Sequence, residues 1–146
     1  MASSSVGSFL MIKKAESSQY EKLVNIRSYP DLGAEPNMLD ADTLSHTFIP
    51  QIRGRQQAVS GSYTILYDLN DIKTLKTYEG QEHEFSLWFG GEDSDGDGLM
   101  EPTGSLGKWD FKGSYTIIVT GADGEAVREA TLAFAITELP HLSSSL

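Results

Sequence analysis

Cysteine is absent from the 146 residues of this chain, which excludes disulfides, thiol catalysis and zinc–thiolate sites. The three histidines, His46, His83 and His141, are far apart in the sequence and do not have the spacing of a metal site. No apolar run approaches the roughly 20 residues that a membrane-spanning helix requires. No basic residue precedes the short apolar patch at 9–12, so the start of the sequence is not typical of a secretory signal. We therefore expect no membrane partner.

Basic residues are also scarce, since 11 Lys and Arg stand against 21 Asp and Glu, for a formal net charge of −10. Proteins that grip nucleic acid need clustered Lys and Arg to displace counterions from the phosphates. The sequence has no basic stripe and no basic cluster interleaved with aromatic residues. The charge therefore argues against nucleic-acid binding, and it favours solubility.

Catalytic patterns are lacking as well. No Gly-x-Ser-x-Gly nucleophile motif, Walker loop or dinucleotide-binding glycine pattern occurs. Two carboxylate pairs, Glu82 with Glu84 and Asp40 with Asp42, lie on extended stretches without a basic or histidine partner. Such pairs are typical of solvated surface, so we predict that the protein is not an enzyme and that it uses no cofactor.

The segment Asp93-Ser-Asp-Gly-Asp-Gly98 is the one site-like motif, because it resembles the start of an EF-hand calcium loop. The twelfth position, where that loop needs a bidentate glutamate, is Gly104, and Glu101 stands at the ninth, where it could still bind an ion. No helix is predicted before the loop. We predict a plain acidic turn and no metal site. The alternative is a bound ion that stabilises the loop.

Alternation of apolar and polar residues predicts most of the secondary structure. It is clear over 56–68 and 82–89, and again over 115–120 and 125–137, which form a predicted hairpin around Asp123-Gly124. Shorter strands are predicted at 9–12 and 23–26. The one convincing helix is 68–78, with Asp68 suited to its N-cap and Gly80 following as a stop.

These elements predict a mainly β fold of two packed antiparallel sheets, a β-sandwich or partial barrel, flanked by one α-helix. We expect a single domain over 9–140, with a flexible N-terminus at 1–8 and a C-terminal tail at 141–146. Two long loops, 28–54 and 90–108, interrupt the predicted strands.

The first of these loops is too apolar for a free linker. Pro30, Pro36 and Pro50 exclude a continuous helix or a central strand. Apolar side chains that a solvated loop would not normally hold recur along it, and such a segment requires a surface to lie on. Five of them are expected to be buried by a neighbouring subunit: Leu32, Met38, Leu39, Phe48 and Ile49.

The same loop carries a resemblance to a known family. It reads Tyr29-Pro-Asp-Leu-Gly-Ala-Glu-Pro-Asn-Met-Leu, then Asp42-Thr-Leu-Ser and Phe48-Ile-Pro-Gln-Ile. After it come a strand, a short helix, an aromatic strand, a Gly-Gly-acidic loop and a final hairpin. From about Leu23 to about Thr137, this order resembles the major tail tube protein of long-tailed bacteriophages, whose fold is two packed sheets flanked by a helix.

The resemblance implies a structural subunit whose hexameric rings stack into a hollow tube that conducts DNA during genome delivery. The implied partners are other copies of the chain and the tail tape measure, tail terminator and tail tip proteins, in a virion assembled in the host cytoplasm. A wall past which DNA slides without sticking should be neutral or negative, as the charge of this chain is. Two faces are candidates for that wall, and the sequence does not decide between Ser60, Ser62 and Thr64 on one strand and Glu82 and Glu84 on another.

The alternative is a monomeric β-sandwich that binds carbohydrate or acts in adhesion, with or without calcium. It would bind its ligand through exposed aromatic residues, for which Trp88 and Trp109 are the candidates. Aromatic residues on strands more often build a core or a subunit contact. The oligomeric state separates the two hypotheses, because the alternative predicts a monomer at every concentration.

Overall fold

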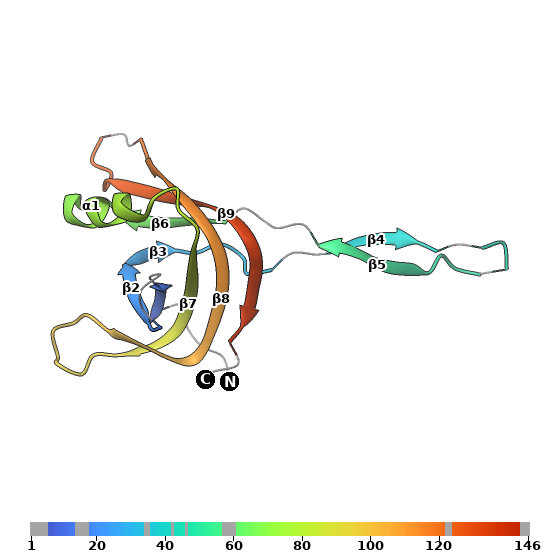
Figure 1. The fold of residues 1–146 in the computed structure, drawn as a ribbon, viewed down its shortest axis with the longest axis horizontal. Helices are drawn as coiled ribbons and strands as arrows, with labels where there is room; N and C mark the ends of the chain where they lie inside the picture. Colours follow the sequence, from blue (N-terminus) through green and yellow to red (C-terminus); the bar gives the residue numbers. More distant parts are fainter. Residues whose placement is uncertain are drawn as a thin grey trace.

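The computed structural model describes residues 6–13, 18–33, 36–41, 43–45, 47–56, 61–121 and 124–143. These residues form nine strands and one helix (Figure 1). In chain order they are β1 (Ser8–Lys13), β2 (Tyr20–Val24), β3 (Ile26–Ser28), β4 (Pro36–Asp40), β5 (Gln51–Gln56), β6 (Ser62–Leu66), α1 (Leu69–Tyr78), β7 (His83–Glu92), β8 (Glu101–Val119) and β9 (Glu129–Leu142). The predicted mainly β fold with one helix and antiparallel sheets is confirmed.

Seven strands form one antiparallel sheet in the order β2-β1-β7-β8-β9-β6-β3. Its two outermost strands, β2 and β3, are consecutive in the chain and are separated only by Asn25. One bent stretch, 20–28, therefore pairs with β1 at one end of the sheet and with β6 at the other. The sheet is curled strongly enough to close around the body of the protein (Figure 1).

The core lies inside this curled sheet, as the predicted alternation requires. On β7, Phe85 and Leu87 point inward and are fully buried, and on β9 Leu132 and Phe134 do the same. Phe85, Phe134, Tyr63, Phe111 and Tyr115 form a contiguous group of aromatic rings with centroids 5.0–6.2 Å apart. Edge-on and tilted contacts prevail in this group, which are arrangements that aromatic pairs favour.

The helix α1 covers one end of the curled sheet and contributes Ile72 and Leu75 to the core. Its predicted N-cap is confirmed, since an Asp68 carboxylate oxygen accepts from the backbone N–H of Asn70 at 2.9 Å. Leu69 lies three residues before Ile72 but is exposed. The ten residues of α1 make a short helix, and no helix in the described parts of the chain has the length and apolarity to cross a membrane.

Three predicted boundaries differ from the structure because strand pairing extends through them. The Gly90-Gly91 pair does not end its strand: β7 continues to Glu92 and pairs with β8 from Glu101 onward, so the irregular part of loop 90–108 shrinks to 93–100. At the C-terminus, β9 runs through Pro140 to Leu142, within the predicted tail. At the N-terminus, Gly7 accepts a backbone hydrogen bond from Gly90, within the predicted flexible segment.

The second sheet consists of β4 and β5 alone, which form an antiparallel hairpin that projects far from the body (Figure 1). Strand β4 lies inside the segment that we predicted as loop 28–54, and β5 begins inside it and ends two residues beyond it. We call residues 36–56 the arm. The prolines are compatible with it, because a two-stranded hairpin has only edge strands and Pro36 is the first residue of β4.

Candidate assembly interface

The arm is held together by its backbone pairing. Leu39 lies opposite Ile52 and Met38 opposite Arg53, and beyond the strands Ala41 donates a backbone hydrogen bond to Pro50 at 2.8 Å. The register shifts between Pro36 and Met38, as expected near a residue that lacks a backbone donor. The hairpin therefore has two faces and two free edges.

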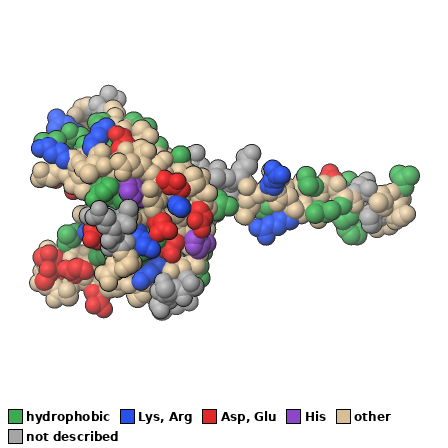
Figure 2. Space-filling model, in the orientation of Figure 1, with side chains coloured by type: hydrophobic (Ala, Val, Ile, Leu, Met, Phe, Trp, Pro, Cys, Tyr) green, Lys and Arg blue, Asp and Glu red, His purple; other side chains and the backbone are tan. Residues whose placement is uncertain are grey.

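Both faces of the arm carry large exposed apolar side chains, since Met38 and Leu39 are consecutive on a strand. Figure 2 shows hydrophobic side chains along the face of the arm that is turned to the viewer. Their exposed fractions are 55% for Met38, 55% for Leu39, 108% for Leu44, 69% for Phe48, 58% for Ile49 and 56% for Ile52. An isolated two-stranded hairpin is marginally stable in water. A contiguous exposed apolar surface of this kind typically marks a protein–protein contact.

Of the five residues predicted as interface, the structure places Met38, Leu39, Phe48 and Ile49 on the arm with their side chains exposed. Leu32 is different, because it precedes the arm and is half-buried against the core of its own chain. The expectation that its own subunit leaves Leu32 uncovered is therefore not met. Tyr29 packs beside it on Phe89, with ring centroids 5.6 Å apart, so the start of the loop is anchored to the body.

Two arginines lie on strand β5 of the arm. Arg53 and Arg55 are two residues apart on one strand, so they share a face, and both are exposed. Neither forms an ion pair or hydrogen bond with any described residue. The arm thus presents unpaired positive charge beside its apolar surface, as the space-filling view shows near its base (Figure 2).

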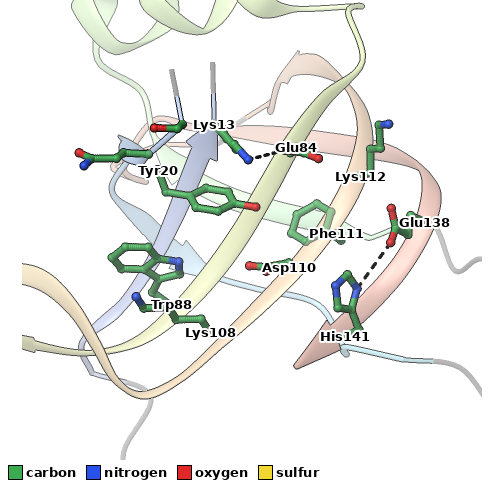
Figure 3. Close-up of a pocket in the computed structure, with 12 residues that line it drawn as sticks. Lys13, Tyr20, Glu84, Trp88, Lys108, Asp110, Phe111, Lys112, Glu138 and His141 are labelled. Carbon is green, nitrogen blue, oxygen red and sulfur yellow. Dashed lines mark ion pairs between the residues drawn. The ribbon is translucent and has the colours of Figure 1, made fainter. Parts of the chain in front are cut away.

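A groove of about 540 Å³ lies on the outer face of the sheet, across strands β1, β7, β8 and β9 (Figure 3). Tyr20 and Trp88 form an aromatic wall with ring centroids 6.1 Å apart. The Lys108 ammonium group lies 4.1 Å from the centroid of the Trp88 ring and covers one of its faces. That face is not available as a stacking platform for a sugar.

Most charged groups at the groove have a partner. Lys13 pairs with Glu84 at 3.3 Å, and Lys112 lies 3.9 Å from Glu82. The remaining close contact joins Glu138 to the imidazole of His141 at 3.9 Å, and this is an ion pair only when the imidazole is protonated. These pairs are partly exposed, so each contributes little to stability.

Three polar groups in the groove have no such partner. The Nε1 of Trp88 is buried and has no hydrogen-bond acceptor among the described residues. The carboxylate of Asp110 and the hydroxyl of Tyr20 form no hydrogen bond or ion pair with any described residue. Burial, followed by the negative charges of Asp110, Glu84 and Glu138, raises the pKa of Tyr20 to about 12, so its hydroxyl stays protonated at neutral pH. The three groups surround the same space (Figure 3).

The two predicted lumen faces differ in character. Ser62 and Thr64 lie on the outer face of β6, opposite Ala133 and Thr131 of β9, which in turn lie opposite Thr116 and Ile118 of β8. This neutral surface of mostly small side chains extends over three strands. By contrast, Glu82 and Glu84 lie among lysines at the groove. Ser60, the remaining candidate, lies outside the described residues.

The acidic turn between β7 and β8 holds Asp93, Asp95 and Asp97, which offer carboxylate oxygens within 4.8 Å of one another. The oxygens already accept hydrogen bonds from the turn itself, including Gly98 N–H to Asp93 at 2.9 Å and Leu99 N–H to Asp97 at 2.9 Å. All three side chains are exposed. This is the geometry of a self-stabilised turn that a hard cation such as calcium could also bind.

The sequence did not point to the groove, because its lining depends on which residues of four strands lie side by side. Alternation placed Trp88 and Glu84 on the same face, and that was the only available signal. No protein-family model and no curated protein matches this chain.

Proposed function

We propose that this chain is a self-assembling structural subunit, the major tail tube protein of a long-tailed bacteriophage or phage-derived particle. In this proposal hexameric rings stack into a hollow tube that conducts DNA during genome delivery. The observation that carries it is the arm, a two-stranded hairpin that exposes six large apolar side chains away from its own body. Burial by neighbouring subunits accounts for such a surface, and the resemblance of the sequence around it specifies the assembly.

The remaining partners and the location follow from the same proposal. The tube would meet the tail tape measure, tail terminator and tail tip proteins, and it would be assembled in the host cytoplasm and reside in the virion. We propose that the surface around Ser62 and Thr64 faces the lumen, because its side chains are mostly small and uncharged and Arg27 at its edge is paired with Glu129 at 2.9 Å. The glutamates Glu82 and Glu84 are the less suitable wall, since lysines accompany them.

The role of the arm is tested by changing two of its exposed apolar residues, Phe48 and Ile49. Negative-stain electron microscopy and sedimentation of the concentrated wild-type protein should show rings or tubes. The double change Phe48→Ser and Ile49→Ser should abolish them, because the apolar contact is lost, while the unfolding midpoint of the body stays unchanged. Val127→Ser is the matched control, since Val127 is 60% exposed on the body rather than the arm. Normal tubes from the double variant would contradict the proposed role of the arm.

One observation favours the alternative, a monomeric calcium-dependent binding module: the convergence of Asp93, Asp95 and Asp97 within 4.8 Å. It predicts heat on titration with millimolar calcium and a strictly monomeric protein at all concentrations. Absence of heat excludes the calcium-dependent form, and concentration-dependent assembly excludes the monomer.

A further inference from the structure

We propose that the groove between Tyr20, Trp88 and Asp110 is the seat for strand β5 of another copy's arm. The inference rests on the proposed self-assembly and specifies where the arm lands. The arm projects away from its own body, so it cannot fill its own groove (Figure 1). A neighbouring copy is therefore the occupant.

The first argument is the match of unpaired charges. Within the groove, Lys13 is paired with Glu84, Lys112 lies beside Glu82, and Lys108 lies over the Trp88 ring. Among the described residues, no cation forms an ion pair with Asp110. Glu138 has only the His141 imidazole. The arm brings two arginines without partners, Arg53 and Arg55, on one face of one strand. Two guanidinium groups can thus meet two carboxylates, and planar bidentate pairs of this type are strong.

The second argument is the unpaired donor of the groove. The Tyr20 hydroxyl stays protonated at neutral pH and donates to no described residue. An edge strand presents backbone carbonyls along its free side. Strand β5 is an edge strand, so one of its carbonyls can accept from Tyr20 while its side chains reach the carboxylates.

The third argument is shape and polarity. The groove is open, crosses several neighbouring strands and has an aromatic wall, which suits an extended strand with apolar side chains better than a compact solute. On the arm, Met38 lies opposite Arg53 on the neighbouring strand, so its exposed side chain shares the face of the arginines. The contact joins different surfaces of the two copies, so it is head-to-tail, and repetition generates a ring or a filament.

Charge reversal tests the pairing of Arg53 with Asp110. Arg53→Glu alone and Asp110→Arg alone should each raise the protein concentration needed for assembly by about tenfold or more. Combined in one chain, the two changes should restore assembly toward the wild-type level, because the pair is re-formed with its charges exchanged. Unchanged unfolding midpoints verify that both single variants fold.

Three results overturn the inference. If wild-type protein assembles and Arg53→Glu assembles equally well, or if the double variant is no better than the singles, the arm does not land in the groove while self-assembly itself stands. If the wild-type protein never assembles, both the inference and the proposed function fail.

Cross-linking tests the position of the arm independently. Because the chain has no native cysteine, only the introduced cysteines react. Arg53→Cys with Asp110→Cys, treated in the assembled state with a short bis-maleimide, should yield a covalent ladder of copies. The matched control is Arg53→Cys with Asp95→Cys, which reports docking on the acidic turn instead. A ladder from the control pair alone would overturn the groove as the seat.

Discussion

Glu79 joins the end of the helix to the sheet. Its carboxylate accepts a hydrogen bond from the Ile117 backbone N–H at 2.7 Å and pairs with Lys76 at 3.0 Å. The hydrogen bond from Ile117, followed by that from Lys76, holds the pKa of Glu79 below its usual value. The helix is thereby fixed to β8 at its C-terminal end, where Gly80 also donates to Tyr115.

A depressed carboxyl pKa makes stability depend on pH in a defined direction. The contribution of Glu79 is present above the pKa of the unfolded chain and is lost as the pH falls through the lower folded pKa. Glu79→Gln should therefore be less stable than wild type at neutral pH, and the difference should shrink as the solution is acidified below the ordinary glutamate pKa. Urea unfolding at several pH values measures this.

The matched control is Glu125→Gln, an exposed glutamate near the β8–β9 turn. Its stability difference from wild type should be small at every pH. A Glu79→Gln difference that stays constant across the acid range would show that packing, and not charge, makes the contribution.

At the residue scale, sequence alternation predicts which side chains enter the core but not which surface groups meet. The period of two places Phe85 with Leu87 on one face and Leu132 with Phe134 on another, and the structure buries all four. The approach of Asp110 to Trp88 and Tyr20 depends on the register between strands far apart in the chain. No local pattern contains that information.

At the scale of elements, strands β8 and β9 pair so closely that one position of β8 has no room for a side chain. Gly113 lies at a register shift and is buried, and a Cβ atom there would come within 2.3 Å of the Ala135 carbonyl oxygen. Gly113→Ala must therefore displace backbone, and we expect a loss of about 1–3 kcal/mol in the free energy of unfolding, measured by urea titration.

Gly121→Ala is the control for this substitution. Gly121 follows the end of the same strand, and a Cβ there would meet nothing within 4 Å. Its stability should stay close to wild type. Equal losses at both positions would mean that chain flexibility, and not the contact with Ala135, determines the effect.

The arm is the element whose type was predicted wrongly, since its strands lie in a segment assigned to a loop. Its apolar residues were recognised, yet both faces of the hairpin carry them, so the alternation typical of a half-buried strand is missing. Prolines at positions 36 and 50 also argued against a central strand. When a second molecule buries a hairpin, the alternation of apolar and polar residues in its own sequence does not predict its strands.

For the molecule as a whole, the net charge of −10 predicts that assembled protein does not retain DNA. Ser62→Lys places a cation on the proposed lumen surface, and tubes carrying it should retain double-stranded DNA in a co-sedimentation assay at about 0.1 M salt, the range in which phosphate contacts are not fully screened. Wild-type tubes should not.

Gln81→Lys is the control, because Gln81 is exposed between α1 and β7 and the change adds the same charge. Tubes with this variant should release DNA as the wild type does. Equal retention by both variants would show only a response to total charge, and it would count against Ser62 as a lumen residue.

Whole-molecule architecture was predicted as far as local patterns allow. The mainly β class, the helix and the final hairpin followed from periodicity. The closure of the sheet did not, because it depends on one stretch, 20–28, that bends at Asn25 and pairs with partners at both ends. Only the three-dimensional pairing shows that β2 and β3 are two halves of one bent stretch.

That closure has a consequence for how the protein is made. Strand β1 can pair with β7 only once β7 has been synthesised, and β6, which holds β3, likewise requires β9. No portion of the chain that lacks β9 can complete the sheet, and pairing between distant segments is slow. The sheet therefore closes only after β9 has been synthesised, when the arm of the same copy is already exposed to the copies around it.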